Sequence, residues 1–445
     1  MWQSYTRPMF EHDPSLPFSV FFAASLLLGL MLKVWLQGRQ VRHVAAHRNT
    51  VPAPFASRID LAAHQKAADY TIAKARMAVI TTAFEAAVLL GWTLLGGLDQ
   101  LNGLLRGFIL DGSPDSAAAA MAYQLSLILS VSLIGAILDM PFEWYRTFVI
   151  EQRYGFNRST VATFLSDGLK SLIVTLILMV PLSALVLWIM QSTGGLWWLW
   201  AFAVITVFQL TMAVVYPSWI APLFNRFTPL QQPELEARIR QLMQRCGFSP
   251  KDLLVMDASR RSSHGNAYFT GLGRSKRVVF FDTLLKTLTP AEVEAVLAHE
   301  LGHFKHRHTT QRLLMMTLAS LAFLSLLGWL CSQAWFYTGL GVRPNLNAPN
   351  DALALILFML AMPVFSTLLT PLAASWSRSH EFQADAYAAS QSDRAELASA
   401  LLKLHEDNAS TLTPDPVYVG FFYSHPPALQ RIQALMTAPP QGTTA

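Results

Sequence analysis

Seven long apolar stretches dominate the pattern of hydrophobic and polar positions along the chain. Each is close in length to the roughly 20 residues that an α-helix needs to cross the hydrocarbon core of a bilayer. Soluble helices of this length are rarely apolar all round, so the pattern favours membrane helices over helices buried in a soluble core. Pro181 and Pro363 lie inside two of the stretches and predict kinks there. The stretches are residues 18–36, 78–97, 121–140, 169–190, 196–216, 313–336 and 352–374.

The composition agrees with a membrane protein. Hydrophobic residues make up 53% of the chain and charged residues 14%, against about 25% charged residues in ordinary soluble domains. The net charge of +5 is modest and no block of like charges is present, so we expect no nucleic-acid partner. The two cysteines, Cys246 and Cys331, are too far apart to form a metal or redox motif. The N-terminus lacks a basic region, so we expect no cleavable signal peptide.

Basic residues are unevenly distributed among the loops, which predicts the orientation in the membrane. The loop at 37–76 carries seven lysines and arginines and only two aspartates. The next loop carries three aspartates and the single Arg106, whereas arginines return in the loop at 141–168. Between the sixth and seventh stretches the only basic residue is Arg343. Because basic loops stay in the cytoplasm, we expect the N-terminus outside and the C-terminus inside.

This orientation places two polar segments on the cytoplasmic face, where we expect them to form one soluble body. The predicted fold class is therefore an all-α multi-pass membrane protein of about seven helices, with a cytoplasmic α+β domain that carries a small β-hairpin or sheet. The predicted division of the chain is a membrane region at 1–216, an insert at 217–312, a two-helix hairpin at 313–374 and a C-terminal segment at 375–445.

Within the insert, the segment TPAEVEAVLAHELGHFKHRH at 289–308 is typical of a helix. Thr289 can cap its N-terminus, with Pro290 in the first position and Glu292 three residues beyond the cap. Apolar residues recur at helical spacing along the segment and predict one buried face.

This helix carries the motif H-E-x-x-H. His299 and His303 are four residues apart, so they lie one turn apart on one face and can hold one Zn²⁺ between them. Glu300 follows His299 directly and can act as the general base that takes a proton from the attacking water. The alternative is a helix face of solvated histidines.

Two histidines leave a tetrahedral zinc ion one protein ligand short, apart from its water. The longer metalloprotease motif needs glycine and histidine where this chain has His306 and Thr309, so that motif is absent. The segment SRSHEFQADAYAASQSD, which follows the seventh stretch, offers Glu381 and Asp385 on one helix face. Since the predicted orientation places this segment on the same membrane face as His299, Glu381 is the expected third ligand.

Asp385, one turn beyond Glu381, can accept the free N–H of a ligand histidine and hold its ring. Taken alone, this pair of acids is also typical of a solvated helix face. His306 and His380 are alternative third ligands that the spacing leaves open.

Together these motifs resemble the integral-membrane zinc metallopeptidases of the type I CAAX prenyl protease family. The similarity extends over most of the chain. The pieces that carry it, in order, are IEQRYGFNRST (150–160), WIAPLFNRFTPL (219–230), RRSSHGNAYFTGLG (260–273), RVVFFDTLL (277–285), LAHELGHFKHRH (297–308), HEFQADAYA (380–388) and FFYSHPPALQRI (421–432).

The resemblance implies a gluzincin-type site in a zincin-like domain, with one Zn²⁺ per chain. It implies His299, His303 and Glu381 as ligands, Glu300 as catalytic base and Asp385 as the partner of a ligand histidine. It also implies a water-filled chamber between the membrane helices, with the metal at its cytoplasmic end. Such a chamber would accommodate Glu85, an acid inside the second stretch, although this residue could equally snorkel or pack in its neutral form.

Two further groups of residues are candidates for substrate handling. NAYFTG and RVVFF flank glycines and predict a β-hairpin, and an edge strand there could pair with an extended peptide. The resemblance assigns that role to the 266–270 stretch, which begins with Asn266 and Ala267. His425 and Arg431, in the motif S-H-P-x-x-x-x-R, could donate hydrogen bonds to a developing oxyanion, and the resemblance places them near the scissile bond.

The sequence therefore predicts a membrane-embedded zinc endopeptidase whose partners are a peptide or protein substrate and the lipid bilayer. The resemblance implies cleavage near the C-terminus of prenylated CAAX-type substrates. A general quality-control peptidase for membrane proteins is the alternative, and a membrane scaffold or transporter with a vestigial site is a rival of another class. The compact loops and the lack of a dilysine retrieval signal favour a bacterial inner membrane, with the active site facing the cytoplasm.

Overall fold

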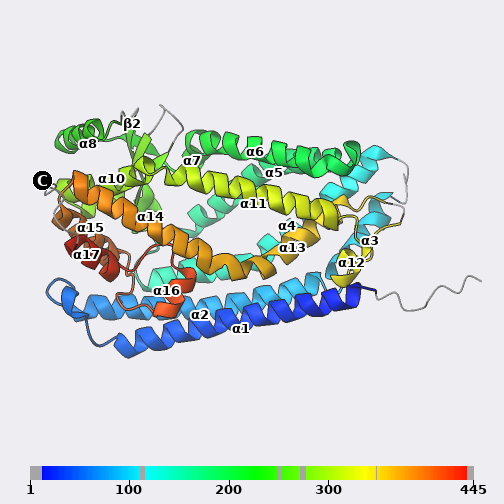
Figure 1. The fold of residues 1–445 in the computed structure, drawn as a ribbon, viewed down its shortest axis with the longest axis horizontal. Helices are drawn as coiled ribbons and strands as arrows, with labels where there is room; N and C mark the ends of the chain where they lie inside the picture. Colours follow the sequence, from blue (N-terminus) through cyan, green and yellow to red (C-terminus); the bar gives the residue numbers. More distant parts are fainter. Residues whose placement is uncertain (1–12, 111–115, 249–251, 271–276, 347, 438–445) are drawn as a thin grey trace, which may run out of the picture.

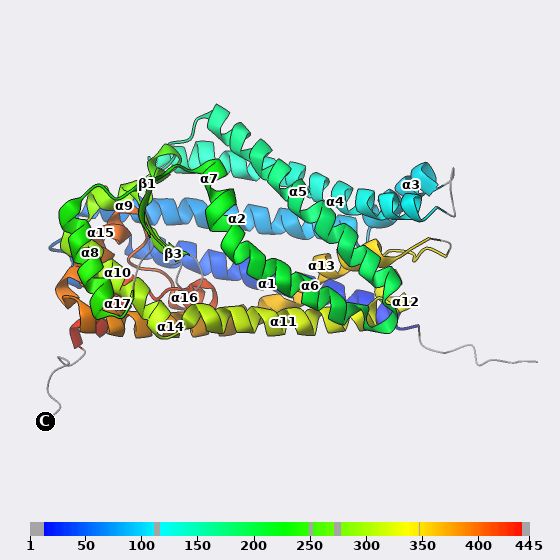
Figure 2. The ribbon, with the colours of Figure 1, turned by 90° about the horizontal axis from the view of Figure 1, so that it is seen from above.

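The structure is a computed structural model that describes residues 13–110, 116–248, 252–270, 277–346 and 348–437. Long helices run side by side along the long axis of the molecule, and the strands and shorter helices gather mainly at the ends of this bundle (Figures 1 and 2).

Within the described residues, seven helical stretches are long and apolar enough to cross a membrane, as the sequence predicts. Three of them contain a change of helix type or a second helix. The stretches are α1 (Ser15–His47), α2 (Leu61–Trp92), α4 (Ala117–Tyr145) with a continuation to Glu151, α5 (Val161–Ser192), Gly194–Phe224 with α6 (Trp197–Val215) and α7 (Ala221–Phe224), α11 (His308–Leu330), and Asp351–Gln391 with α13 (Asp351–Ser366) and α14 (Thr370–Gln391).

Polar side chains mark where several of these helices begin. Asp60, Ser116 and Thr160 each precede a long helix and accept a hydrogen bond from a backbone N–H in its first turn. The first amides of a helix lack intrahelical partners, so these caps stabilise the N-termini of α2, α4 and α5.

Two of the predicted stretches extend beyond the observed helices. α2 ends at Trp92, five residues before the predicted limit, and the chain then turns at Gly96, whose φ of +76° suits glycine. α11 ends at Leu330, before the short helix α12 (Ala334–Gly339). α5 continues as one helix through Pro181, whereas the helix around Pro363 ends at Ser366 and a 3₁₀ turn leads into α14.

The insert contains a four-stranded mixed sheet with the order β1-β2-β4-β3. β2 and β4 are parallel, whereas β3 pairs with β4 and β1 with β2 in antiparallel fashion, so the predicted hairpin between NAYFTG and RVVFF is confirmed. Gly271 and Gly273 of this hairpin lie outside the described residues. The strands are β1 (Phe227–Pro229), β2 (Asp252–Met256), β3 (Ala267–Thr270) and β4 (Arg277–Phe281).

Helices from the insert and from the C-terminal segment surround this sheet and share one hydrophobic core. Leu297 from the insert is buried in the same cluster as Leu397 and Leu435 from the C-terminal segment. Segments separated by two membrane helices in the sequence therefore pack as one body. The helices are α8 (Pro233–Arg245), α9 (Asp282–Thr287), α10 (Pro290–Lys305), the end of α14, α15 (Arg394–Asp407) and α17 (Ala428–Thr437). The short helix α16 (Pro416–Phe422) packs against α14 and α1 instead.

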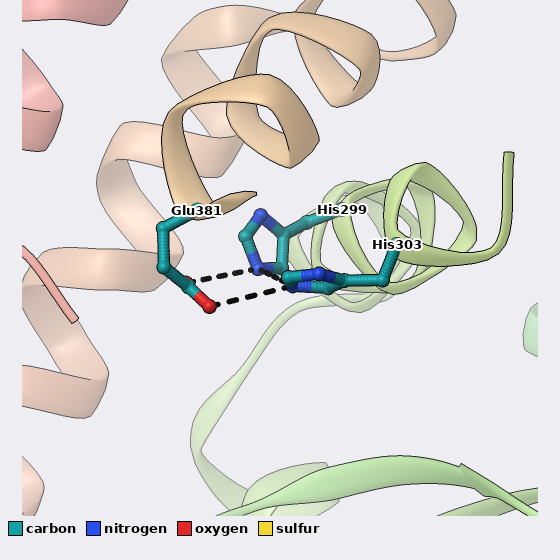
Figure 3. A group of neighbouring side chains, drawn as sticks. All are labelled: His299, His303 and Glu381. Atoms are coloured by element: carbon teal, nitrogen blue, oxygen red, sulfur yellow. Dashed lines mark hydrogen bonds and ion pairs between the residues drawn. The ribbon is translucent and has the colours of Figure 1, made fainter. Parts of the chain in front are cut away.

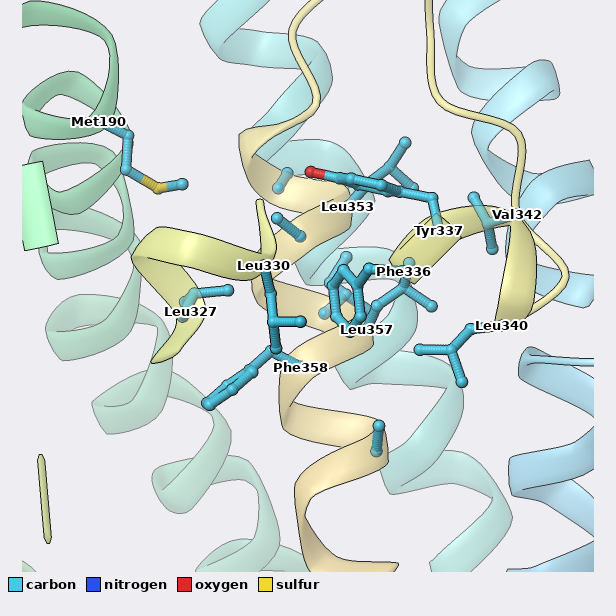
Figure 4. Packing of buried hydrophobic residues seen from close by; sticks show 14 of the residues in the cluster. Met190, Leu327, Leu330, Phe336, Tyr337, Leu340, Val342, Leu353, Leu357 and Phe358 are labelled. Atoms are coloured by element: carbon cyan, nitrogen blue, oxygen red, sulfur yellow. The ribbon is translucent and has the colours of Figure 1, made fainter. Parts of the chain in front are cut away.

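A second hydrophobic cluster lies at the opposite end of the bundle, where α12 and α3 (Gly97–Leu110) are found (Figures 1 and 4). Leu330, Phe336 and Leu357 are among its buried members. α1 begins at this end, whereas α10, α15 and α17 lie at the other (Figure 1). The start of α1 and the soluble body are thus on opposite ends of the helices.

Candidate metal centre

The helix α10 begins with the predicted capping box. The Thr289 side chain accepts a hydrogen bond from the backbone N–H of Glu292, and the Glu292 carboxylate accepts one from the N–H of Thr289. The buried Glu292 carboxylate also accepts hydrogen bonds from Ser399 and Lys403 of α15. These contacts fix the start of the helix that carries the H-E-x-x-H motif.

His299, His303 and Glu381 come together at one point, two from α10 and one from α14 (Figure 3). The Nε2 atoms of the two histidines lie 3.2 Å apart. Each Nε2 lies 3.5 Å from a carboxylate oxygen of Glu381. Glu381 Oε2 is buried and has no hydrogen-bond partner among the described residues.

This group fits a zinc ion. Two ligand atoms at the usual 2.0–2.2 Å from a tetrahedral zinc ion are separated by about 3.3–3.5 Å. The distances within the group match that separation, and the donors are the two imidazoles and one carboxylate that catalytic zinc sites commonly use. The unpartnered oxygen of Glu381 is also explained, because a metal ion would satisfy it.

The remaining ring nitrogen of His299 faces a carboxylate. Asp385 Oδ1 lies 2.8 Å from His299 Nδ1, where the sequence predicts the partner of a ligand histidine. Arg431 in turn donates two hydrogen bonds to Asp385, at 2.8 and 2.6 Å. The side chains of His299, Asp385 and Arg431 are all buried. Asp385, itself held by Arg431, therefore keeps the His299 ring oriented with its Nε2 toward Glu381.

His303 has a corresponding partner that the sequence reasoning missed. Its Nδ1 lies 2.9 Å from Nδ1 of His308, and His308 Nε2 lies 2.9 Å from Gln383 Oε1 on α14. The spacing of five residues gives no helical signal, because Arg307 adopts a left-handed backbone (φ 58°) that ends α10 and turns His308 back toward His303.

α10 and α14 approach closely at the glycine inside the motif. A Cβ atom on Gly302 would lie 2.8 Å from the Cα of Ala384 and 3.0 Å from its carbonyl oxygen. No side chain fits there without moving a backbone, so this contact sets the distance between the helix with the histidines and the helix with Glu381.

Glu300 and His425 complete the surroundings of the group. Burial raises the pKa of Glu300, which suits a group that must accept a proton near neutral pH. His425 Nε2 lies 3.3 Å from Glu381 Oε1, and its side chain is 65% exposed, so it borders both the group and the open space beside it.

The two histidines of the motif differ in their affinity for protons. Burial lowers the pKa of His303 to about 3, and the nearby His299 adds to this effect. Burial also disfavours the charged form of His299, but its contacts with Asp385 and Glu381 outweigh this and raise its pKa to about 9. A metal ion that binds here must therefore displace a proton from His299.

The edge strand β3 packs against α10, the helix that carries both histidines of the motif. Phe269 on β3 packs against Phe304 on α10 with ring centroids 5.0 Å apart. Because β3 pairs with β4 on one side and is last in the sheet, its other edge has no strand partner among the described strands. Asn266 precedes this strand, and its side chain accepts a hydrogen bond from the N–H of Ala267.

The other candidates from the sequence lie nearby without joining the group. Within the described residues, the cluster suited to a metal comprises only His299, His303 and Glu381. His306 and His380 instead stack on the ring of His308, at 5.5 and 3.9 Å. Elsewhere, Glu85 lines a small cavity of about 160 Å³ that Lys33 also lines, and Cys246 and Cys331 are free thiols.

Membrane-length helices combined with an H-E-x-x-H helix and a downstream glutamate define a class, the integral-membrane metallopeptidases. Two family models match the chain: "CAAX prenyl protease N-terminal, five membrane helices" over residues 40–226 and "Peptidase family M48" over residues 229–438. The chain belongs to the CAAX prenyl protease 1 family within peptidase family M48. It is a multi-pass membrane protein and a zinc metalloendopeptidase.

Relatives of known name match over nearly the full length. The CAAX prenyl protease 1 of Saccharomyces cerevisiae is 32% identical over 96% of this chain and 97% of its own. The CAAX prenyl protease 1 homolog of Homo sapiens is 29% identical over 94% of this chain and 95% of its own. The crystal structure of S. mikatae Ste24p superposes with a TM-score of 0.85 at 30% identity, covering 94% of this chain and 99% of that one.

Proposed function

We propose that this protein hydrolyses a peptide bond near the C-terminus of prenylated CAAX-type substrates. The observation that carries the proposal is the group of His299, His303 and Glu381, which has zinc geometry and adjoins a cavity in a chain of this family. The substrate class rests on the relatives, which are named CAAX prenyl protease 1.

The proposed roles follow from the contacts. His299, His303 and Glu381 would hold Zn²⁺, which when bound would supply a Lewis acid that polarises the scissile carbonyl and makes water more acidic. Glu300 takes the proton from the attacking water and delivers it to the leaving amine. The free edge of β3, beginning at Asn266 and Ala267, pairs with the extended substrate backbone.

His425 and Arg431 have different proposed roles because their partners differ. His425 is exposed next to Glu381 and can donate a hydrogen bond to the oxyanion. Arg431 is buried, and its Nε and one terminal nitrogen are bonded to Asp385. Its other terminal nitrogen lies 3.6 Å from Glu381 Oε2, so we propose that it chiefly positions Asp385 and leaves one N–H facing the site.

We further propose that residues 217–312 and 375–445 act as one catalytic body on the cytoplasmic face, with the N-terminus outside. The distribution of basic residues among the loops supports this orientation. The compact loops support a bacterial inner membrane, whereas the named relatives come from eukaryotes. Fractionation of the host's membranes, followed by immunodetection, distinguishes these locations.

The function is tested with the purified, zinc-loaded protein and two reporter peptides that differ only in the prenyl group on the cysteine. A preference of tenfold or more in kcat/KM for the prenylated peptide is the expected result. Equal cleavage of both peptides would instead favour a general quality-control peptidase. Stoichiometric zinc without cleavage of either peptide would favour the vestigial site of a scaffold or transporter.

A further inference from the structure

A cavity of about 470 Å³ lies between α1 and α2 on one side and the C-terminal segment on the other. His425 and Arg431 line one part of it, and both contact the proposed ligand Glu381. Lys74 of α2 and Gln37 of α1 line another part. The volume falls in the range of pockets that bind small ligands and short peptides.

The charges of this cavity favour an anion. Its lining contains no aspartate or glutamate. Of the lysine and the arginine in its lining, Arg431 is already paired with Asp385. Lys74 is the other, and among the described residues its ammonium contacts only the face of the Tyr70 ring, 4.0 Å from the centroid.

The nearby acid Glu151 does not neutralise Lys74 by direct contact. Its carboxylate accepts a hydrogen bond from Tyr70 at 2.6 Å and lies 3.6 Å from His264 Nε2, and no ion pair joins it to Lys74 in the described part of the chain. Lys74 therefore lies between this cavity, which has no acids in its lining, and a second cavity of about 970 Å³ that Glu143 and Glu151 line. Its ammonium forms no ion pair within the described part of the chain and can turn to the first cavity.

The cavity also suits a peptide with aliphatic side chains. Gln37 and Gln40 contribute amide side chains to its lining, a residue type that can hydrogen-bond to peptide groups. Apolar surface is provided by Ala75, Ala78 and Leu401. A short aliphatic peptide with a negative end matches each of these features.

We propose that Lys74 binds the free α-carboxylate at the C-terminus of the substrate, so that the cavity holds the residues that leave after cleavage. This inference rests on the proposed function. An extended residue spans about 3.3–3.6 Å, so three leaving residues would reach about 10 Å beyond the bond that is cut. An anchored carboxylate makes the enzyme cut at a set distance from the chain end.

The experiment compares two prenylated reporter peptides, one ending in a free carboxylate and one in a carboxamide. The full-length, zinc-loaded protein is assayed as wild type, Lys74→Met, Lys74→Arg and Lys66→Met. Lys66 lies on the same helix but does not line the cavity, so it is the matched control. The readout is the ratio of kcat/KM for the acid to that for the amide.

The wild type and Lys66→Met should prefer the acid by about tenfold to a hundredfold, the usual contribution of a hydrogen bond to a charged group. Lys74→Met should bring the ratio close to one, mainly through KM, and Lys74→Arg should retain most of the preference.

Equal cleavage of both peptides by the wild type overturns the inference but leaves the proposed function intact. An equal loss on both peptides in Lys74→Met also overturns it, because it indicates a structural role. Failure of the wild type to cleave either peptide would refute the proposed function itself.

Discussion

Asp385 Oδ1 lies 2.8 Å from Nδ1 of His299 and thereby leaves His299 Nε2 facing Glu381. A ring held in this way presents its Nε2 atom to a metal ion. The carboxylate accepts a hydrogen bond from Nδ1–H, which makes Nε2 a stronger electron-pair donor to the metal. The same carboxylate is bonded by Arg431, so the orientation of the ring depends on two further side chains from two other helices.

Asp385→Asn keeps the size of the side chain but removes its charge, so the His299 ring is less well held. We expect zinc affinity and turnover to fall by about tenfold to a hundredfold, with partial rescue by added zinc. A zinc titration against a chelator, together with peptide cleavage, measures both effects. Asp252→Asn, at a half-buried ion pair with Arg277 in the sheet, is the control. Wild-type affinity in Asp385→Asn would show that the carboxylate does not orient the ligand.

Glu300→Gln should abolish cleavage while zinc stays bound. Glu300 lies outside the group of three candidate ligands, and the substitution removes only its ability to accept a proton. Metal analysis and a cleavage assay on the same sample check the expectation. Near-normal turnover would exclude Glu300 as the base.

Glu381→Ala should lose most bound zinc, whereas His306→Ala should retain it. Glu381 is the only carboxylate in the described cluster, and His306 stacks on His308 outside it. His308→Ala should give an intermediate loss, because His308 contacts only the outer nitrogen of His303. The zinc content of each variant is measured after gel filtration. If His306→Ala loses the zinc and Glu381→Ala keeps it, the third ligand is on α10 and not on α14.

The orientation can be tested by the labelling of single cysteines in a background without Cys246 and Cys331. Cysteines at 57 and 262 should react with a membrane-impermeant maleimide only from the cytoplasmic side. A cysteine at Ser332, which follows α11 at the other end of the bundle, should react only from outside. Labelling of positions 57 and 262 from opposite sides would contradict the proposed topology.

Acid should destabilise the protein in part through Glu292. Burial raises the pKa of Glu292, but its hydrogen bonds from Lys403, Thr289 and Ser399 outweigh burial and lower it overall. A lowered pKa in the folded state stabilises the protein above the unfolded pKa of about 4.3, and this stability is lost as the pH falls through the folded value.

We therefore expect Glu292→Gln to unfold more readily at neutral pH, by about 1–3 kcal/mol, and to lose part of the pH dependence below about pH 4.5. Thermal unfolding in detergent between pH 3 and 7 checks this, with the exposed Glu234 changed to glutamine as the control. Parallel pH profiles for the wild type and Glu292→Gln would contradict the assignment.

The sequence by itself determined the local features of this protein, because they depend on residues close together in the chain. The membrane helices follow from runs of apolar residues, and the histidine pair follows from a spacing of four within a capped helix. The apolar pattern predicts later ends for α2 and α11 than the structure has, since apolar residues continue beyond the turns that stop the helices.

Only the tertiary structure decided how remote segments meet. The contact of Gly302 with Ala384 sets the distance between α10 and α14, and no periodicity in either helix predicts it. The pairing of Arg431 with Asp385, and that of His308 with His303, depends on the positions of whole helices and on one left-handed turn. These positions result from the packing of the entire bundle, because van der Waals contacts and buried charges act between surfaces and carry no signal at fixed sequence spacing.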